Sequence, residues 1–457
     1  MDRSEMTAVA VTAGIAAAEP EDFVHKGGWY TLGVILAVTL FGFVDRQVLT
    51  LAAAPMAKEL SLSDGQLGLV QGLAFAIFSL VATFPLAWAA DRFDRRYVLS
   101  ACVLTWSIGT ALCGLAQSFE QLFLAAVLIA AGEAGLTPIC YAVVPDLFSG
   151  RKRTLANGLF YLFSFVGVSA GLALGGGALS ALDQLHDRLP SALRAFSSWR
   201  LSFFAVASPA PIFMVLTWFA TLRRRVAAPT SSKGAEDLGN FMPFLRSHWA
   251  TLALVFAALA FYFLAFGGYL SWLPVAAARV FNATPAANGL GMAAATFVGM
   301  VGGVGLGQVL MRLYGPQHGL GAPIRTAFVV ALAGTPIVLG FPFIQAAWQG
   351  YALFGALMLV GTTIGSLVPS ILQDLAPPKL RARVAALYTI AAGLIGGAAP
   401  TLVGWVSGAL GKDPRGLLVA ITIVALPTWI VTVLLFRLSQ RRFADLAGQL
   451  ATDAARP

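Results

Sequence analysis

The sequence has few charged residues: they make up 11% of its 457 positions, whereas soluble globular domains carry about 25%. Hydrophobic residues make up 58%. A soluble fold cannot cover this much apolar surface with so little charge, but a lipid bilayer can, because the solvent around the protein is then itself apolar. The composition therefore argues against an ordinary soluble domain and indicates a membrane protein.

Cysteine is also scarce, and the three cysteines, Cys102, Cys113 and Cys140, all fall in apolar stretches. We interpret them as small packing residues and expect no disulfide and no metal site. A phosphate-cradling Gly-Lys-Ser/Thr loop and a nucleophile elbow are missing as well. These absences argue against ATP-driven transport, an enzymatic activity and a bound cofactor.

The apolar residues form stretches of the length that a membrane-spanning helix needs, roughly 20–28 residues. Twelve spans are predicted, at residues 29–54, 65–90, 97–117, 121–147, 154–178, 201–222, 249–277, 287–311, 324–344, 350–374, 382–409 and 415–436. The expected fold class is therefore an all-α membrane protein. Residues 1–28 lack the pattern of a signal peptide and are expected to be a disordered tail.

The basic residues sit in short clusters between these spans, which does not suit binding of nucleic acid despite the net charge of +9. With a cytoplasmic N-terminus, 22 of the 30 Lys and Arg residues lie in cytoplasmic segments and seven lie outside. Because cytoplasmic loops are enriched in Lys and Arg, we expect both termini to be cytoplasmic. The expected location is the cell inner membrane.

The longest predicted cytoplasmic linker, residues 223–248, divides the chain into two six-helix bundles at 29–222 and 249–436, with a tail at 437–457. Within the linker, residues 241–249 favour a short amphipathic helix on the membrane surface. The halves echo each other, since Asp146-Leu147 ends the fourth span and Asp374-Leu375 ends the tenth. This recurrence indicates a duplicated unit, a known plan among transporters.

The loop after the second span reads Asp91-Arg92-Phe-Asp-Arg95-Arg96. An acid at a helix end followed by basic residues can latch neighbouring helices through charge-assisted hydrogen bonds, although the arginines alone also fit a cytoplasmic anchor. The loop resembles the signature loop of the major facilitator superfamily, and the resemblance implies two pseudo-symmetric six-helix bundles. The residues expected to control gating are Asp91, Arg92, Arg95, Arg96, Asp146 and Asp374.

Two further stretches, Phe43-Val-Asp45-Arg46-Gln-Val-Leu and Gly132-Glu133-Ala134-Gly135, resemble bacterial Spinster-like members of that superfamily. Animal Spinster members move lysophospholipids or sphingosine phosphate, so the resemblance implies a lipid-like amphiphile as substrate. One position departs from the family pattern: Ala126 stands where an Arg is usual, seven residues before Glu133.

Asp45, Arg46 and Glu133 are the charges placed deep within the predicted spans. A charge at the bilayer centre costs about 2.5–3.5 kcal/mol on insertion scales, so a functional reason is expected. We predict that the three residues share a cavity and serve proton coupling and substrate binding, with Asp45 as the partner of Arg46. The structural alternative is a static ion network that locks the first span to the fourth.

The second half has no deep charge, and its polar residues are weaker candidates for the substrate cavity, because tyrosines there also suit core packing. The candidates, with two from the fourth span, are Thr137, Tyr141, Tyr262, Tyr269, Thr362, Thr363, Ser366 and Tyr388. We expect a polar head group to lie in the first half and an apolar tail in the second.

The expected function is proton-linked transport, by alternating access, of a lysophospholipid or sphingolipid-like amphiphile. Proton symport of a small organic anion and a transport-inactive receptor or scaffold remain the alternatives. The expected partners are the amphiphilic substrate, protons and the lipid bilayer, and the expected state is a monomer.

Overall fold

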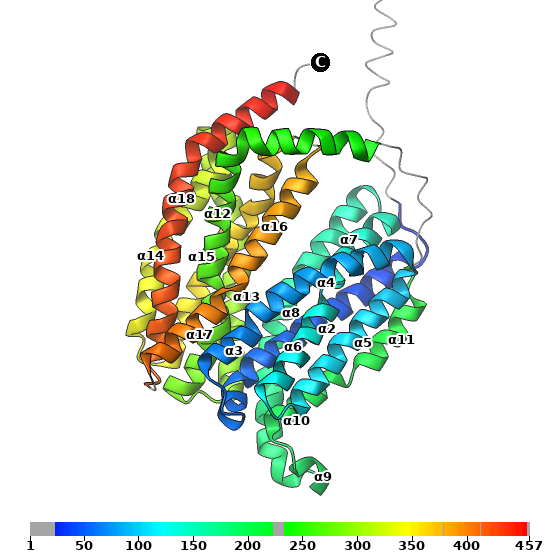
Figure 1. Cartoon of the computed structure of the whole chain (residues 1–457), viewed down its shortest axis with the longest axis vertical. Helices are drawn as coiled ribbons and strands as arrows, with labels where there is room; N and C mark the ends of the chain where they lie inside the picture. The colour runs from blue at the N-terminus through cyan, green and yellow to red at the C-terminus, as the bar shows by residue number, and fades with distance from the viewer. Residues whose placement is uncertain (1–22, 223–232, 378, 412, 455–457) are drawn as a thin grey trace, which may run out of the picture.

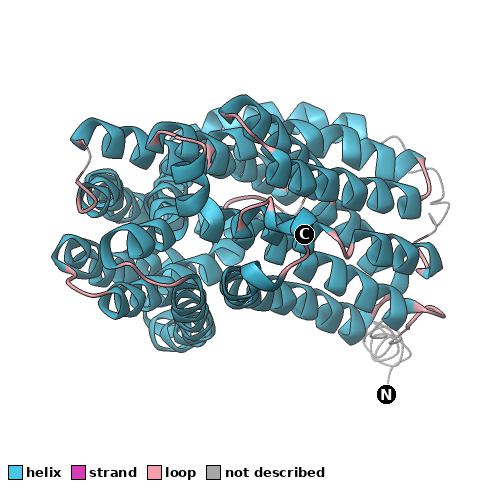
Figure 2. Cartoon of the chain, turned by 90° about the horizontal axis from the view of Figure 1, so that it is seen from below, coloured by secondary structure: helices cyan, strands magenta, loops and turns pink. Residues whose placement is uncertain are grey.

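The computed structural model describes residues 23–222, 233–377, 379–411 and 413–454. These residues form helices joined by short loops (Figure 2). Within the described residues no β-strand occurs, and the extended pairing is limited to a single bridge between Val24 and Phe148. The predicted all-α class is confirmed.

The first half is a bundle in which several predicted spans are broken into two consecutive helices. Its helices are α2 (Gly28–Glu59), α3 (Asp64–Gln71), α4 (Leu73–Arg92), α5 (Arg95–Leu115), α6 (Phe119–Glu133), α7 (Leu136–Leu147), α8 (Gly150–Leu185), η1 (His186–Arg188), α9 (Ser191–Arg194), α10 (Ser198–Ala207) and α11 (Ala210–Phe219). Gly72 separates α3 from α4, with φ −116° and ψ −99°. Pro209 is the N-cap of α11, and Pro211 stands in its first turn, where a missing N–H costs nothing.

The second half has longer helices. They are α12 (Lys233–Phe281), α13 (Pro285–His318), η2 (Gly319–Gly321), α14 (Ala322–Gly340), η3 (Phe341–Phe343), α15 (Ala347–Asp374), α16 (Arg381–Gly397), α17 (Ala399–Leu410) and α18 (Gly416–Ala454). The break at Ala398 between α16 and α17 lies in the eleventh predicted span and matches the break at Gly72 in the second.

The described helices form eleven apolar stretches long enough to cross a membrane, one of which, Pro285–Phe343, has 59 residues. A straight helix of that length would measure about 88 Å, nearly three times the hydrocarbon core of a bilayer. The turn at η2 divides it into α13 and α14, which are separate helices. Twelve crossings result, as the hydropathy pattern predicts.

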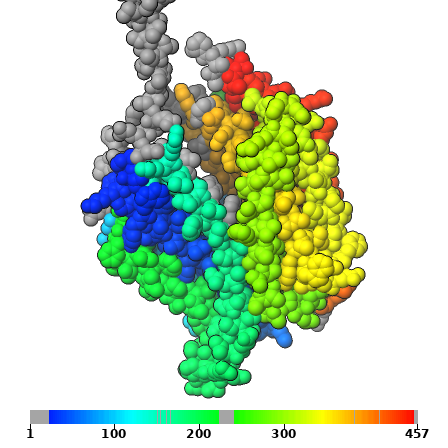
Figure 3. Space-filling view, turned by 180° about the vertical axis from the view of Figure 1, so that it is seen from behind, coloured from blue at the N-terminus to red at the C-terminus, as the bar shows by residue number. Residues whose placement is uncertain are grey.

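The two halves approach each other at one end of the molecule and diverge at the other (Figure 1). We call the end where α3, α10 and α17 lie the closed end, and the end where α7 and the start of α12 lie the open end. A hollow between the halves opens toward the C-terminal residues (Figure 3). At the closed end, Gly176 of α8 and Gly289 of α13 pack backbone to backbone, and a Cβ on Gly176 would lie 2.8 Å from the Cα of Gly289.

Two predicted boundaries need correction. Helix α12 begins at Lys233, so the described part of the expected linker is helical. The helix expected at 241–249 is part of α12, whose first turns run across the open end before the helix enters the bundle (Figure 1). Helix α18 continues to Ala454, because Phe443 and Leu446 are buried and extend its apolar face beyond the predicted end at 436. The expected tail at 1–28 lies mostly outside the described residues, and α2 begins at Gly28.

Candidate functional site

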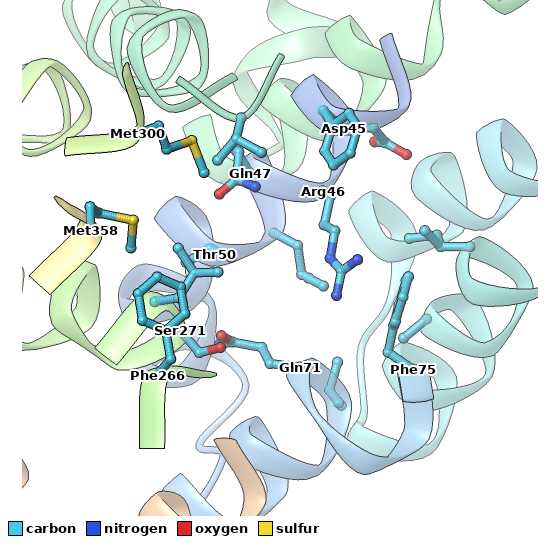
Figure 4. A pocket seen from close by; sticks show the side chains of 17 residues that line it. Asp45, Arg46, Gln47, Thr50, Gln71, Phe75, Phe266, Ser271, Met300 and Met358 are labelled. Carbon is cyan, nitrogen blue, oxygen red and sulfur yellow. The ribbon is translucent and has the colours of Figure 1, made fainter. Parts of the chain in front are cut away.

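Two adjoining cavities lie between the halves, a central cavity of about 210 Å³ and a side cavity of about 460 Å³. The central cavity is lined from the first half by Phe43, Asp45, Arg46, Gln47, Leu49, Thr50, Val70, Gln71, Phe75, Ala126, Ile129 and Val168, and from the second half by Phe266, Leu270, Ser271, Met300 and Met358. Figure 4 shows Arg46 entering this cavity from α2 and Gln71 from α3. The walls are mainly apolar with a few polar groups, as is usual for ligand sites.

The two cavities meet at a small set of shared residues, which we call the junction. Its members are Arg46, Gln71, Phe75, Phe266, Leu270 and Ser271. The first three come from the first half and the last three from α12 of the second half. The junction therefore combines one cation, one amide and one hydroxyl with two aromatic rings and a leucine, contributed by both halves.

Arg46 is the one cation among the described residues that line these cavities. Its side chain is exposed to the space between the halves although α2 is otherwise largely buried. The guanidinium lies 3.9 Å from the centre of the Phe75 ring, a cation–π contact that holds the charge in place while leaving its N–H donors available. Arg46 can therefore receive an anionic group.

Asp45 also lines the central cavity, but its carboxylate is turned toward α5. Its Oδ2 accepts a hydrogen bond of 2.6 Å from the hydroxyl of Thr110 on α5, and the residue is 3% exposed. Consecutive residues on a helix point about 100° apart, so adjacency in sequence turns the two side chains away from each other. The expected ion pair between Asp45 and Arg46 is therefore not among the ion pairs of the described residues.

Glu133 lies at the last position of α6, where the fourth span breaks before α7. The flanking glycines permit close packing, because a Cβ on Gly132 would lie 2.7 Å from the Cβ of Trp106. Its Oε1 is buried without a hydrogen-bond partner among the described residues. Glu133 attracts the charge of Arg46 and repels that of Asp45, so the three form one electrostatic cluster, although Glu133 lines neither cavity.

Ala126 lines the central cavity and is 2% exposed. The position where the family pattern has an Arg therefore faces the same space as Arg46. With alanine there, Arg46 is the single guanidinium among the described residues that line the cavity, and the apolar wall is larger.

The weaker candidates lie outside both cavities. Several donate hydrogen bonds to backbone carbonyls of the second half: Tyr262 to Gly361 at 2.7 Å, Tyr269 to Val338 at 3.3 Å, Thr363 to Gly303 at 3.0 Å and Ser366 to Thr363 at 2.8 Å. The remaining ones are Thr362, packed near Gly303, Tyr388, whose ring lies 5.8 Å from that of Phe256, and the exposed Thr137 and Tyr141 of α7. These contacts are typical of helix packing.

Sequence reasoning missed Gln71 and Ser271 of the junction. Gln71 ends α3 directly before the break at Gly72. A polar residue beside a glycine inside an apolar span is a signal that could have drawn attention to it. Ser271 offered no such signal, since isolated serines are common in membrane helices.

The expected gating residues gather at the open end. Arg95 of α5 pairs with Asp146 of α7 at 2.6 Å and so joins helices of the same half. The Arg92 guanidinium lies 5.2 Å from the Trp88 ring, Asp91 is exposed, and the backbone N–H of Arg96 donates to Asp94 at 3.0 Å. In the second half, Asp374 interacts electrostatically with Arg381.

The closed end holds a polar clamp between the halves that sequence reasoning did not anticipate. Asp64 at the start of α3 pairs with Arg279 of α12 at 2.6 Å and accepts a hydrogen bond from Ser407 of α17 at 2.7 Å. Next to it, the Thr401 hydroxyl donates to the Gly68 carbonyl at 3.0 Å. These bonds close one end of the space between the halves, while the other end stays open.

The arrangement is a ligand cavity between two bundles that is accessible from one side. It presents a cation to a ligand and surrounds it with apolar walls. Such a geometry binds and releases a solute, and the described residues around Arg46 hold neither a paired nucleophile and base nor a metal-ligating cluster.

Comparison with known proteins agrees with this geometry. The family model described as Major Facilitator Superfamily matches residues 35–400. Similar proteins include an MFS-type efflux pump of Mycolicibacterium smegmatis (26% identical, 85% of this chain and 86% of the other) and the sphingosine-1-phosphate transporter SPNS2 of Danio rerio (23%, 83% and 76%). A probable galactarate/D-glucarate transporter of Pseudomonas putida is 22% identical over 83% of this chain and 85% of its own.

Among solved structures, a bacterial homologue of the human lysosomal transporter Spinster, in an inward-facing and unoccupied conformation, superposes with a TM-score of 0.73. It is 23% identical, and the match covers 93% of this chain and 98% of that one. These matches bear out the resemblance to Spinster-like proteins and the twelve-helix fold. The chain belongs to the Major Facilitator Superfamily, as a membrane transporter.

Proposed function

We propose that this transporter moves a single-chain amphiphile with an anionic head group, of the lysophospholipid or sphingolipid-like class, by proton-linked alternating access. The observation that carries the proposal is the junction, where Arg46 is the one cation that the described lining places between apolar walls. A phosphate or carboxylate head meets the guanidinium through charge-assisted hydrogen bonds. An acyl tail is accommodated along Phe75, Phe266, Met300 and Met358.

The relatives support the substrate class without fixing it. SPNS2 is named for sphingosine 1-phosphate, which joins an alkyl chain to a phosphate, the combination that the junction suits. The galactarate/D-glucarate transporter is named for small dianions without a tail. A small organic anion is therefore the second candidate, favoured by the modest 210 Å³ of the central cavity.

The proposed proton carrier is Glu133. Its Oε1 has no partner among the described residues, and it interacts with Arg46 without being held in a short ion pair. An anionic head group that reaches Arg46 competes with Glu133 for the same cation. Loading of substrate and a change in the protonation of Glu133 are then linked through Arg46.

We further propose that the open end faces the cytoplasm, on the basis of the Lys and Arg distribution. The state described is then inward-open. Asp91 and Arg92, on the open side, belong to the latch that forms when the molecule opens the other way.

The substrate class is tested by binding to purified protein. The probes are oleoyl lysophosphatidate, monooleoylglycerol and glucarate, with stabilisation against heat as the readout. The proposal predicts strong stabilisation by the lysophosphatidate and weak stabilisation by the neutral lipid. Stabilisation by glucarate alone would favour the second candidate, and no response to any probe would overturn the proposed substrate class.

Coupling is tested with Glu133→Gln in proteoliposomes. Flux of the bound probe is measured with and without an imposed pH gradient. We expect the variant to lose the acceleration by the gradient and to keep binding within about threefold, because Arg46 remains to hold the anion. Glu120→Gln, an exposed change on the first turn of the same helix, is the matched control. Gradient-driven flux at the wild-type level in Glu133→Gln would contradict the coupling role.

Orientation is tested by cysteines at His25, exposed at the open end, and at Asn282, exposed at the closed end. Ser439, in the predicted cytoplasmic tail, is unsuitable as a further site because it is fully buried in α18. A membrane-impermeant maleimide applied to intact cells should label position 282 and spare position 25. The opposite labelling would reverse the proposed topology.

A further inference from the structure

The side chain of Gln71 has an unusual environment. Both atoms of its carboxamide, Oε1 and Nε2, are buried, and neither has a hydrogen-bond partner among the described residues. Buried amides are nearly always hydrogen-bonded, and those without a partner need an explanation. Gln71 lines both cavities, so this amide lies at the place where a ligand would pass from one to the other.

Ser271 of α12 is the polar member of the junction that the second half contributes. Two residues thus add neutral donors to the guanidinium of Arg46: the Nε2 of Gln71 has two N–H groups, and Ser271 has one O–H. These donors converge on one space from three different helices, α2, α3 and α12 (Figure 4).

The clamp at the closed end sets the distance between the two neutral donors. Gln71 follows Asp64 by seven residues on α3, and Ser271 precedes Arg279 by eight on α12, which are about 10 Å and 12 Å along the two helices. The Asp64–Arg279 ion pair therefore places both residues about two turns deeper in the molecule, facing the same cavities. The break at Gly72 ends α3 at this depth.

We propose that Gln71 and Ser271 form, with Arg46, a head-group subsite for an oxyanion that spans both halves. This inference rests on the proposed function and names the residues that select the head group. It differs from the sequence expectation, in which the second half contacts only the tail. Because one donor comes from α12, the subsite is complete only while α3 and α12 are held together at the closed end.

The subsite should distinguish ligands of equal chain length by the charge of their head groups. An oxyanion accepts bonds from the guanidinium of Arg46, the Nε2 of Gln71 and the hydroxyl of Ser271, and a free hydroxyl on the glycerol of a lysophosphatidate can donate to the Oε1 of Gln71. A neutral glycerol head can still bond to Gln71 but loses the charge-assisted interaction with Arg46. Removal of one neutral donor to a charged ligand typically weakens binding by about tenfold. A carboxylate at position 71 would repel the oxyanion and remove its two N–H donors, with a loss of about 100-fold.

The test measures the Kd of oleoyl lysophosphatidate and of monooleoylglycerol for the full chain in nanodiscs. Gln71→Leu and Ser271→Ala should each weaken binding of the lysophosphatidate about tenfold, and Gln71→Glu about 100-fold. Because a neutral hydroxyl makes weaker hydrogen bonds than an oxyanion, the neutral lipid should weaken by no more than about threefold in each variant. Gln184→Leu, a matched change at an exposed position of α8 outside both cavities, should change neither Kd.

Two outcomes separate this inference from the proposed function. If wild-type protein binds the lysophosphatidate, Arg46→Ala abolishes that binding, and Gln71→Leu and Ser271→Ala bind normally, the subsite is wrong while the proposed substrate class stands. If wild-type protein binds neither lipid, the proposed substrate class itself fails. Equal weakening of both lipids by Gln71→Leu would assign Gln71 to packing and overturn the inference, and thermal unfolding of each apo variant shows whether the fold is retained.

Discussion

The two halves share one fold but differ in how many of their buried polar groups have hydrogen-bond partners. In the second half, long polar side chains are satisfied by backbone carbonyls, as Tyr262, Trp272 and Trp429 show with bonds of 2.7, 2.8 and 2.9 Å. The described part of the first half holds ten buried polar atoms without partners, among them Asp45 Oδ1 and both amide atoms of Gln71 at the cavities and Glu133 Oε1. The described second half has two such atoms, on Thr296 and Gln440.

Buried polar groups with and without partners have different consequences for a transporter. A polar group that is satisfied by the fold stabilises one packing, whereas one left unsatisfied gains from a proton, a water or a ligand. We therefore propose that the second half serves mainly as a rigid wall, with Ser271 as its contribution to the junction. In this proposal the first half carries the groups that respond to solute, with Arg46 at their centre.

The largest expected effect is that of Arg46→Ala. The change removes the one cation that the described cavity lining offers, together with its charge-assisted bonds, and should weaken binding of an anionic amphiphile about 100-fold. Radioligand binding and proteoliposome flux measure the loss. Arg415→Ala, at an exposed site of the closed end, serves as control. Undiminished binding in Arg46→Ala would remove the basis for placing the chemistry in the first half.

A smaller effect is expected from Asp64→Asn, which changes the clamp that holds the two halves together at the closed end. The variant loses the ion pair with Arg279 and weakens the bond from Ser407. A loss of about 1–2 kcal/mol would change the ratio of closed to open states at this end by about 5- to 30-fold. Spin labels at exposed positions 58 and 415, one in each half, report the distance between the bundles.

The distance distribution should broaden toward longer values in Asp64→Asn. Because Gln71 and Ser271 are positioned by the same clamp, affinity for the anionic amphiphile should fall together with the closed population. Asp183→Asn, an exposed acid at the same end, should leave both measurements unchanged. Identical distributions in wild type and Asp64→Asn would show that backbone packing such as that of Gly176 on Gly289 suffices to hold this end.

The hydropathy pattern predicts the twelve crossings because the bilayer imposes a length on each helix, and this requirement is local in sequence. The glycines next to Glu133 predict close packing and bending there, because the effect of a missing Cβ is confined to its own position in the chain. The extension of α18 was missed because its buried face, with Phe443 and Leu446, alternates with charged residues and lowers the mean hydropathy.

The site was predicted less completely, for reasons of orientation and distance. Depth along a helix can be counted, but the direction of a side chain depends on its neighbours. The carboxylate of Asp45 accepts a bond from Thr110, while the guanidinium of Arg46 lies over the Phe75 ring. The clamp joins residues 215 positions apart, which no local pattern encodes. Gln71 and Ser271 become significant only when α3 and α12 are seen to line one space.

The smallest expected effect, and the sharpest test of the contrast between the halves, is that of Tyr262→Phe. The change removes one hydroxyl from the buried second half and leaves the Gly361 carbonyl without this donor. Hydrogen bonds within membrane bundles contribute about 0.6 kcal/mol on average, so the melting temperature should fall by at most about 2 °C. Flux and its response to a pH gradient should stay at the wild-type level, because the hydroxyl lines neither cavity. A tenfold fall in flux at an unchanged melting temperature would place Tyr262 in the transport path and show that the second half also carries chemistry.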